Sequence, residues 1–271
     1  MTFETLTVSA AGAIGRLTLN RPERLNALGA TTLRELAAAA RWFDERPDVR
    51  VVILGGAGRA FTAGADLRDP SIAEALPASG KSWSQRREVG QLGLRMADAI
   101  EGMRAVTIAK VQGHAVGGGI VIMAACDLRV AAEDAVLSIP EIELGIPLAW
   151  GGIPRLVREI GPAMTKELVM TCRPFGPREA QAMGFVNRVV PASRLDAEAE
   201  ALAAEIAAKP SVPVMITKEH VNAVTRAMSA GITSFADGDA LLSTVFDPES
   251  FEARQAYVER TLGKRGKTPG G

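Results

Sequence analysis

Histidine and cysteine are scarce in this sequence, with two of each among 271 residues. Cys126 and Cys172 are too few for a disulfide framework or a structural zinc site, so we expect two buried free thiols. His114 and His220 leave little scope for a histidine-based metal site, and we expect both to be structural, although His114 adjoins a glycine cluster. The sequence therefore predicts no metal centre.

Net charge is absent as well, because 31 lysine and arginine residues balance 31 aspartate and glutamate residues. Binding to nucleic acid needs a cationic surplus, so no nucleic-acid partner is expected. No apolar run reaches about 18 residues, the length that spans a bilayer, so no membrane partner is expected. Residues 1–4 show neither the basic nor the apolar segment of an export signal, and we expect a cytoplasmic protein.

Strand and helix patterns alternate over the first fifty-odd residues. Alternating apolar residues predict strands at 5–9 and 14–20. The spacing of Thr32 and Glu35 is that of a capping box and predicts the start of a helix. The β-branched run 49–54 predicts a buried strand. Strand, helix and strand in this order indicate a βαβ unit and an α/β fold.

The same alternation continues toward the middle of the chain. We interpret the proline- and glycine-broken segment 68–82 as a mobile surface loop. A helix is predicted over 85–103, followed by strands at 106–111 and 128–131. Proline and glycine punctuate residues 139–154, where no regular element is predicted.

Beyond residue 192 the pattern becomes almost entirely helical. Leu195, Ala199, Leu202 and Ile206 fall on one helical face. We therefore predict an α/β body over 1–192 and an all-helical part over 193–271. The last residues of that part are basic and rich in glycine, and we expect a flexible tail.

Two loops rich in small residues follow predicted strands, at 59–66 and 113–119. Small residues let a backbone N–H approach a ligand closely, and the second loop opens an apolar helix, whose N-terminus carries partial positive charge. Two such loops could each aim one N–H at a single oxygen, as in an oxyanion hole. The other interpretation is that these glycines only let a helix pack tightly on a strand. Dinucleotide, phosphate-loop and nucleophile-elbow motifs are all incomplete.

Glu141 stands between Pro140 and the apolar Ile142. Poor solvation there would raise the pKa of its carboxyl group and suit it to proton transfer near neutral pH. Glu143 would face the opposite side of an extended segment, and we interpret it as a solvated surface carboxylate.

Four motifs stand in order between residues 21 and 145: RPERLNAL at 21–28, FTAGADL at 61–67, QGHAVGGG at 112–119 with CD at 126–127, and PEI at 140–142 with LG at 144–145. In this set and spacing the chain resembles the crotonase family, also called the enoyl-CoA hydratase/isomerase superfamily. The resemblance implies a spiral of repeated ββα units and a C-terminal helical trimerisation domain, often assembled as a dimer of trimers.

The same resemblance implies an acyl-CoA thioester as substrate. It assigns the thioester oxygen to the backbone N–H groups of Ala63 and Gly118, and proton transfer to Glu141. Residues matching Arg24, Leu25 and Ala27 would bind the adenine end, with Gly64, Ala65 and Asp66 along the coenzyme A path. No metal or redox cofactor is implied, because the two N–H groups stabilise the enolate and coenzyme A is part of the substrate.

One departure from the family pattern bears on the reaction. Hydratases of this family carry a second glutamate at the position of Val121, which here can neither orient water nor deliver a proton. The aspartate of dienoyl isomerases is also missing, since position 149 is alanine. We therefore predict double-bond isomerisation with Glu141 as single proton carrier. Enoyl-CoA hydration, and acyl-CoA binding without turnover, stay open as alternatives.

Overall fold

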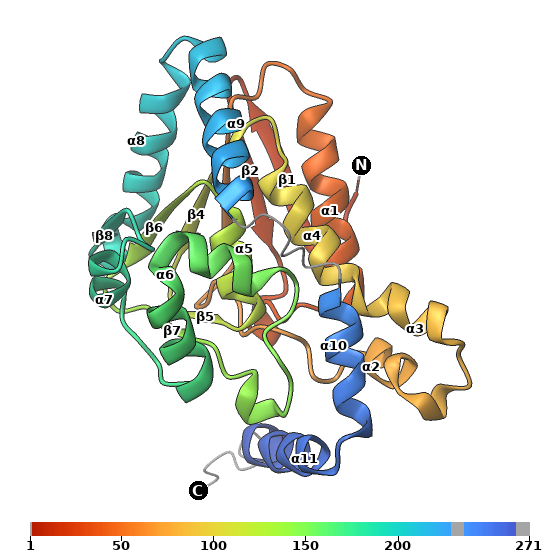
Figure 1. The fold of residues 1–271 in the computed structure, drawn as a ribbon. Helices are drawn as coiled ribbons and strands as arrows, with labels where there is room; N and C mark the ends of the chain where they lie inside the picture. The colour runs from red at the N-terminus through yellow and green to blue at the C-terminus, as the bar shows by residue number, and fades with distance from the viewer. Residues whose placement is uncertain (1, 229–235, 264–271) are drawn as a thin grey trace, which may run out of the picture.

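The computed structural model describes residues 2–228 and 236–263 (Figure 1). Within these residues, six strands form the main sheet in the order β1-β2-β3-β4-β6-β8. The first two pair antiparallel as a hairpin and all later neighbours pair parallel. The strands are β1 (Leu6–Ala11), β2 (Ile14–Leu19), β3 (Val51–Gly56), β4 (Val106–Val111), β6 (Leu128–Ala132) and β8 (Arg188–Val190). The predicted α/β fold is confirmed.

A second, two-stranded parallel sheet pairs β5 (His114–Val116) with β7 (Val136–Ser138). Helices connect and cover the strands. In chain order they are α1 (Ala30–Asp44), α2 (Pro70–Ala75), α3 (Trp83–Gly90), α4 (Leu92–Glu101), α5 (Gly118–Ala125), α6 (Gly152–Thr171), α7 (Pro177–Ala182), α8 (Leu195–Ala207), α9 (Ser211–Met228), α10 (Asp237–Ser243) and α11 (Pro248–Gly263).

The two faces of the sheet bury two separate hydrophobic cores. Along β3, Val52 and Leu54 face the larger core, which includes apolar residues of α1, α4 and α5. Val51 and Ile53 face a smaller core with residues of α8. The alternation follows from the two-residue period of a strand. Because both faces are covered, the run is apolar throughout, which is typical of a parallel strand.

Helix α8 packs on the sheet face opposite α1 and α4 (Figure 1). Its buried residues are Leu195, Ala199, Leu202 and Ala203, close to the face predicted from the sequence. Although α8 follows the predicted boundary at residue 192, it completes the core of the α/β body. The boundary itself stays a prediction.

The predicted start of the first helix is wrong. Helix α1 begins at Ala30 with Gly29 as N-cap, so Thr32 caps nothing and is buried inside the helix. Instead, the Asp69 carboxylate accepts the Ala30 N–H over 3.0 Å, from a segment 39 residues away. Glu35, the other residue of the expected capping box, does not cap the helix either. Its carboxylate accepts the N–H of Thr5, near β1, over 2.8 Å.

The predicted helix over 85–103 is divided into α3 and α4 at Gln91. The segment 68–82, expected to be a mobile surface loop, contains helix α2 and a 3-10 turn, Pro77–Ser79. Pro70 occupies the first turn of α2, where its missing N–H costs nothing, and the Asp69 side chain caps the Ser71 N–H over 2.8 Å. The same proline that suggested a break therefore starts a helix.

The predicted tail falls mostly on residues 264–271, which lie outside the described residues. Within the described parts of the chain, no helix is long and apolar enough to cross a membrane.

Candidate active site

The two glycine-rich loops lie side by side beyond β3 and β4. Thr62 donates its N–H to the His114 carbonyl over 2.9 Å and accepts the Val116 N–H over 3.2 Å. A Cβ built on Gly64 would lie only 2.7 Å from the Val116 carbonyl oxygen. The loops therefore meet backbone to backbone, and position 64 has no space for a side chain.

Ala63 does not present a free donor, contrary to the sequence prediction. Its N–H donates to the Leu25 carbonyl over 2.9 Å, inside the loop. The next candidate is Ala65. Gly64 and Asp66 both bond to Leu28, and peptide groups of an extended chain point alternately to opposite sides, so the Ala65 N–H points away from Leu28. Within the described residues this N–H has no hydrogen-bond partner, and Ala65 lines the cavity described below.

Gly118 begins helix α5, and Gly117 is its N-cap with a φ of +51°. The first N–H groups of a helix have no partner within it. Here Ile120 and Val121 both donate to the Gly117 carbonyl, over 2.8 and 3.2 Å. No acceptor for the Gly118 N–H lies among the described residues, and Gly118 lines the same cavity.

Glu141 is buried, with 9% of its surface exposed, and lines the cavity. One carboxylate oxygen, Oε2, is buried without a hydrogen-bond partner among the described residues. Burial raises the pKa of Glu141 to about 7, as the sequence argument expects. Glu143 is instead exposed and forms an ion pair with Arg260, so it is a surface carboxylate.

Val121 is 1% exposed and lines the cavity from the first turns of α5. Ala149 lines it from the segment before α6. The two positions at which relatives could carry a second carboxyl group therefore border the cavity with apolar side chains.

Asp66 lines the cavity and pairs with two arginines from the segment before α1. Arg21 Nη1 lies 3.0 Å from Oδ2, and Arg24 Nη2 lies 3.3 Å from Oδ1. Of the residues predicted for the adenine end, Arg24, Leu25 and Ala27 do not line the cavity. They lie beside it, joined to its wall by the Arg24–Asp66 pair and the Ala63–Leu25 hydrogen bond.

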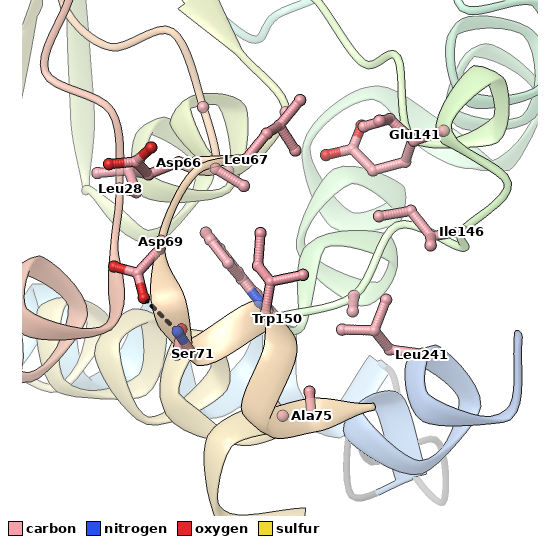
Figure 2. Close-up of a pocket in the computed structure, with 18 of the residues that line it drawn as sticks. Leu28, Asp66, Leu67, Asp69, Ser71, Ala75, Glu141, Ile146, Trp150 and Leu241 are labelled. Carbon is pink, nitrogen blue, oxygen red and sulfur yellow. Dashed lines mark hydrogen bonds between the residues drawn. The ribbon is translucent and has the colours of Figure 1, made fainter. Parts of the chain in front are cut away.

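The cavity has a volume of about 280 Å³ and a mostly apolar wall. Figure 2 shows Glu141 and Ile146 on one side, Leu28 and Asp66 on the other, and the Trp150 ring between them. The described residues contain no group of three or more histidine, cysteine, aspartate or glutamate side chains placed to hold a metal ion. The site therefore offers backbone donors and a protonatable carboxyl group in an apolar space.

Sequence reasoning missed two parts of this wall. Trp150 has a φ of +59°, and its ring is held between Gly93 and Gly118. Cβ atoms built on these glycines would lie 2.1 and 2.2 Å from ring carbons. The second part comes from the C-terminal helices, which supply Leu241, Leu242, Val245, Arg254, Tyr257 and Val258. The sequence gives no sign that Trp150 or the C-terminal helices line the cavity, because their positions depend on packing between distant segments.

Comparison with known proteins identifies the family of this chain. The family model for enoyl-CoA hydratase/isomerase matches residues 9–264. The chain belongs to the enoyl-CoA hydratase/isomerase family. The resemblance to the crotonase superfamily is thereby confirmed, and the protein is an enzyme of this family's type.

Individual relatives agree over most of their length. A probable enoyl-CoA hydratase of Mycobacterium bovis is 37% identical over 237 residues, which cover 86% of this chain and 87% of the relative. A crotonyl-CoA hydratase of Syntrophomonas wolfei is 34% identical over 241 residues, covering 87% and 90%. The crystal structure of an enoyl-CoA hydratase from Mycobacterium avium subsp. paratuberculosis superposes with a TM-score of 0.82 at 26% identity, over 94% of this chain and 99% of that chain.

Proposed function

We propose that this protein moves a double bond of an enoyl-CoA thioester from the 3 to the 2 position, with Glu141 as single proton carrier. The proposal rests on which acidic side chains in the cavity wall have hydrogen-bond or ion-pair partners. Asp66 is paired with Arg21 and Arg24, and Asp69 caps backbone N–H groups, which holds the pKa of its carboxyl group below the usual range. Glu141 is left as the carboxyl group without a partner for one of its oxygens among the described residues.

The reaction needs one proton to leave and one to return. The Glu141 carboxylate takes a proton from C2 of the 3-enoyl thioester, and the electron pair moves onto the thioester oxygen as a dienolate. The N–H groups of Ala65 and Gly118 hold that oxygen, and one such donor contributes roughly 2.7–4 kcal/mol to transition-state stabilisation. The Glu141 carboxyl group then returns the proton to C4, which completes the 2-enoyl thioester and restores the carboxylate.

A pKa of about 7 suits Glu141 to both halves of this cycle. Near neutral pH its basic and acidic forms are both populated, which is the favourable condition for a group that first accepts and then donates a proton. The cycle uses no metal or redox group. The segment with Arg24, Leu25 and Ala27 is proposed to hold the adenine end of coenzyme A.

Hydration of a 2-enoyl thioester is the second candidate, because the relatives above are named hydratases. The deciding experiment measures isomerisation and hydration rates in wild type, Val121→Glu and Val121→Gln. We expect wild type to isomerise faster than it hydrates. Val121→Glu should raise hydration relative to isomerisation, because a carboxylate opposite Glu141 can orient a water molecule. Val121→Gln controls for the size and polarity of the new side chain.

Other results of this experiment would favour one of the other candidate functions. Wild type that hydrates faster than it isomerises would contradict the proposal and favour hydration. Tight binding of acyl-CoA with neither reaction would favour the third candidate, a non-catalytic acyl-CoA-binding protein. A second glutamate could also fail to help because two buried carboxyl groups share a proton, which a pH profile of Val121→Glu would show as a raised apparent pKa.

We further propose that the protein assembles as a trimer or a dimer of trimers. Helix α9 leaves five large apolar side chains exposed: Val212, Ile216, Val221, Val224 and Met228. Apolar patches of this kind on a protein surface mark interaction sites.

A further inference from the structure

Among the described residues that line the active-site cavity, Arg254 is the one basic side chain. The ionisable acids and bases of this wall are Asp66, Asp69, Glu141 and Arg254, with the phenol of Tyr257 beside them. Asp66 and Asp69 are occupied by the partners described above. Arg254, on the C-terminal helix α11, has no role in the proposed proton transfer.

Arg254 is half-buried and has no carboxylate partner among the described residues. Arg254 Nη2 donates a hydrogen bond to Thr244 Oγ1 over 3.1 Å. A guanidinium group carries five N–H donors, so most of its donors are available. Burial lowers the pKa of Arg254 from its ordinary value, yet arginine stays charged in proteins. A cation withdrawn from water without an anion is unfavourable, and a ligand that supplies the anion gains from the pairing.

The position of Arg254 on α11 directs it toward the cavity. Ser250, one turn earlier, contacts the loop after Glu141, since a Cβ on Gly145 would lie 2.2 Å from the Ser250 carbonyl oxygen. Tyr257 and Val258, one turn later, line the cavity together with Arg254. Residues three and four apart share a helix face, so this face of α11 is the one turned to the site.

Arg254 also lies on the α10 side of the cavity. Its hydrogen-bond partner Thr244 belongs to the turn after α10, the helix that contributes Leu241 to the wall. Figure 2 shows Leu241 on the far side of the Trp150 ring from Leu28 and Asp66. Under the proposed function, coenzyme A lies on the Asp66 side, so the end of the acyl chain would approach α10 and α11.

We propose that Arg254 binds an anionic group at the end of the acyl chain, so that the preferred substrates are coenzyme A thioesters of acids with a second, distal carboxylate. This inference rests on the proposed function for the position of the acyl chain. The planar guanidinium can bind a carboxylate through two parallel hydrogen bonds.

The test uses the full-length protein and two matched series of saturated straight-chain coenzyme A thioesters, which bind without reacting. Members of each pair have the same chain length and end in either a methyl group or a carboxylate. Dissociation constants are measured by calorimetry for wild type, Arg254→Met, Arg254→Lys and the control Arg260→Met. Arg260 lies on the same helix but pairs with Glu143 outside the cavity.

At the best chain length, wild type should bind the carboxylate-ended thioester more tightly than its methyl-ended partner. Arg254→Met should weaken only the carboxylate-ended ligand, by about 10- to 100-fold, as expected for hydrogen bonds to a charged group. Arg254→Lys should recover part of this preference, and Arg260→Met should leave the ratio of the two constants unchanged. Circular dichroism of each variant verifies that the fold is retained.

Equal loss of both ligands in Arg254→Met would overturn the inference, because Arg254 would then contact the coenzyme A part. Unchanged constants for both ligands would also overturn it and assign Arg254 to solvent. Failure of the proposed function is a separate result, since it is read from the turnover of methyl-ended 3-enoyl thioesters.

Discussion

The carboxylate of Glu141 rests against the backbone of Gly117. A Cβ built on Gly117 would lie 2.3 Å from Oε1 and 3.2 Å from Cδ of Glu141. Gly117 has a φ of +51° and caps helix α5, whose first N–H group is the proposed oxyanion donor. One residue therefore sets the position of both the proton carrier and the donor.

Gly117→Ala should accordingly reduce kcat by about 100-fold, the typical consequence of displacing a catalytic group by about an ångström. The φ of +51° and ψ of −108° at position 117 are also unfavourable for alanine, by roughly 1–3 kcal/mol, so the melting temperature should fall. Gly12→Ala is the matched control, because Gly12 has a similar φ of +57° and a Cβ added there would meet nothing within 4 Å. Equal kcat in both variants would contradict the close packing of Glu141 on Gly117.

Glu141→Gln should lower kcat by about two to four orders of magnitude, the usual contribution of a general acid–base group. Binding of a non-reactive acyl-CoA should stay within a few-fold of wild type, because the amide preserves the shape of the site. Glu143→Gln, at an exposed carboxylate two residues away, should leave kcat near the wild-type value. Turnover of Glu141→Gln close to wild type would remove Glu141 from its proposed role.

The raised pKa of Glu141 also predicts a pH dependence of stability. In the unfolded chain this carboxyl group ionises near its ordinary value of 4.5, and in the folded protein near 7. Between these values the folded state binds more protons, so the free energy of unfolding falls as pH rises. The loss saturates above about pH 7 at an order of 3 kcal/mol. Denaturant titrations from pH 4 to 8 should show this slope in wild type and not in Glu141→Gln.

Trp150 should determine which acyl groups fit the cavity. Trp150→Ala removes the ring that lies between Gly93 and Gly118 and should raise kcat/KM for bulky acyl groups relative to short ones. Trp83→Ala is the control, since Trp83 is exposed and lies outside the cavity wall. Binding of acyl-CoA should also change the tryptophan fluorescence of wild type and of Trp83→Ala, and leave that of Trp150→Ala unchanged.

The exposed apolar side chains of α9 should drive assembly. Replacing Ile216 and Val224 together with glutamate places charge in the proposed interface and should convert the trimer or hexamer to smaller species in light scattering. Met170→Glu, which alters an exposed apolar residue on α6, is the control. Wild type that already elutes as a monomer would contradict the proposed assembly.

Deleting the whole C-terminal part would remove α8, which belongs to the core of the α/β body. Removing residues 193–271 would expose Val51, Ile53 and their neighbours, because α8 covers that face of the sheet. We expect such a chain to lose its fold, whereas the α9 substitutions should preserve the circular dichroism spectrum.

The sequence determined the periodic elements of this protein. The β-branched run 49–54 predicts a buried strand, and the four ordered motifs identify the family. The sequence also indicated Glu141, because a carboxyl group between a proline and apolar residues is poorly solvated wherever that segment packs. These features are local, so they can be recognised without knowing which segments meet.

Tertiary structure decided what depends on contact between distant segments. Whether Ala63 or Ala65 presents its N–H depends on the segment with Leu25 and Leu28 that pairs with the loop. The start of α1 is set by Asp69 rather than by Thr32. The Asp69 carboxylate, which belongs to a distant segment, accepts the N–H of Ala30, the first residue of the helix. Arg254 reaches the cavity only because α11 packs beneath the loop after Glu141. Sequence periodicity identifies a helix and its apolar face. Which N–H groups and charged side chains face the site depends on hydrogen bonds and packing between residues that are remote in the sequence.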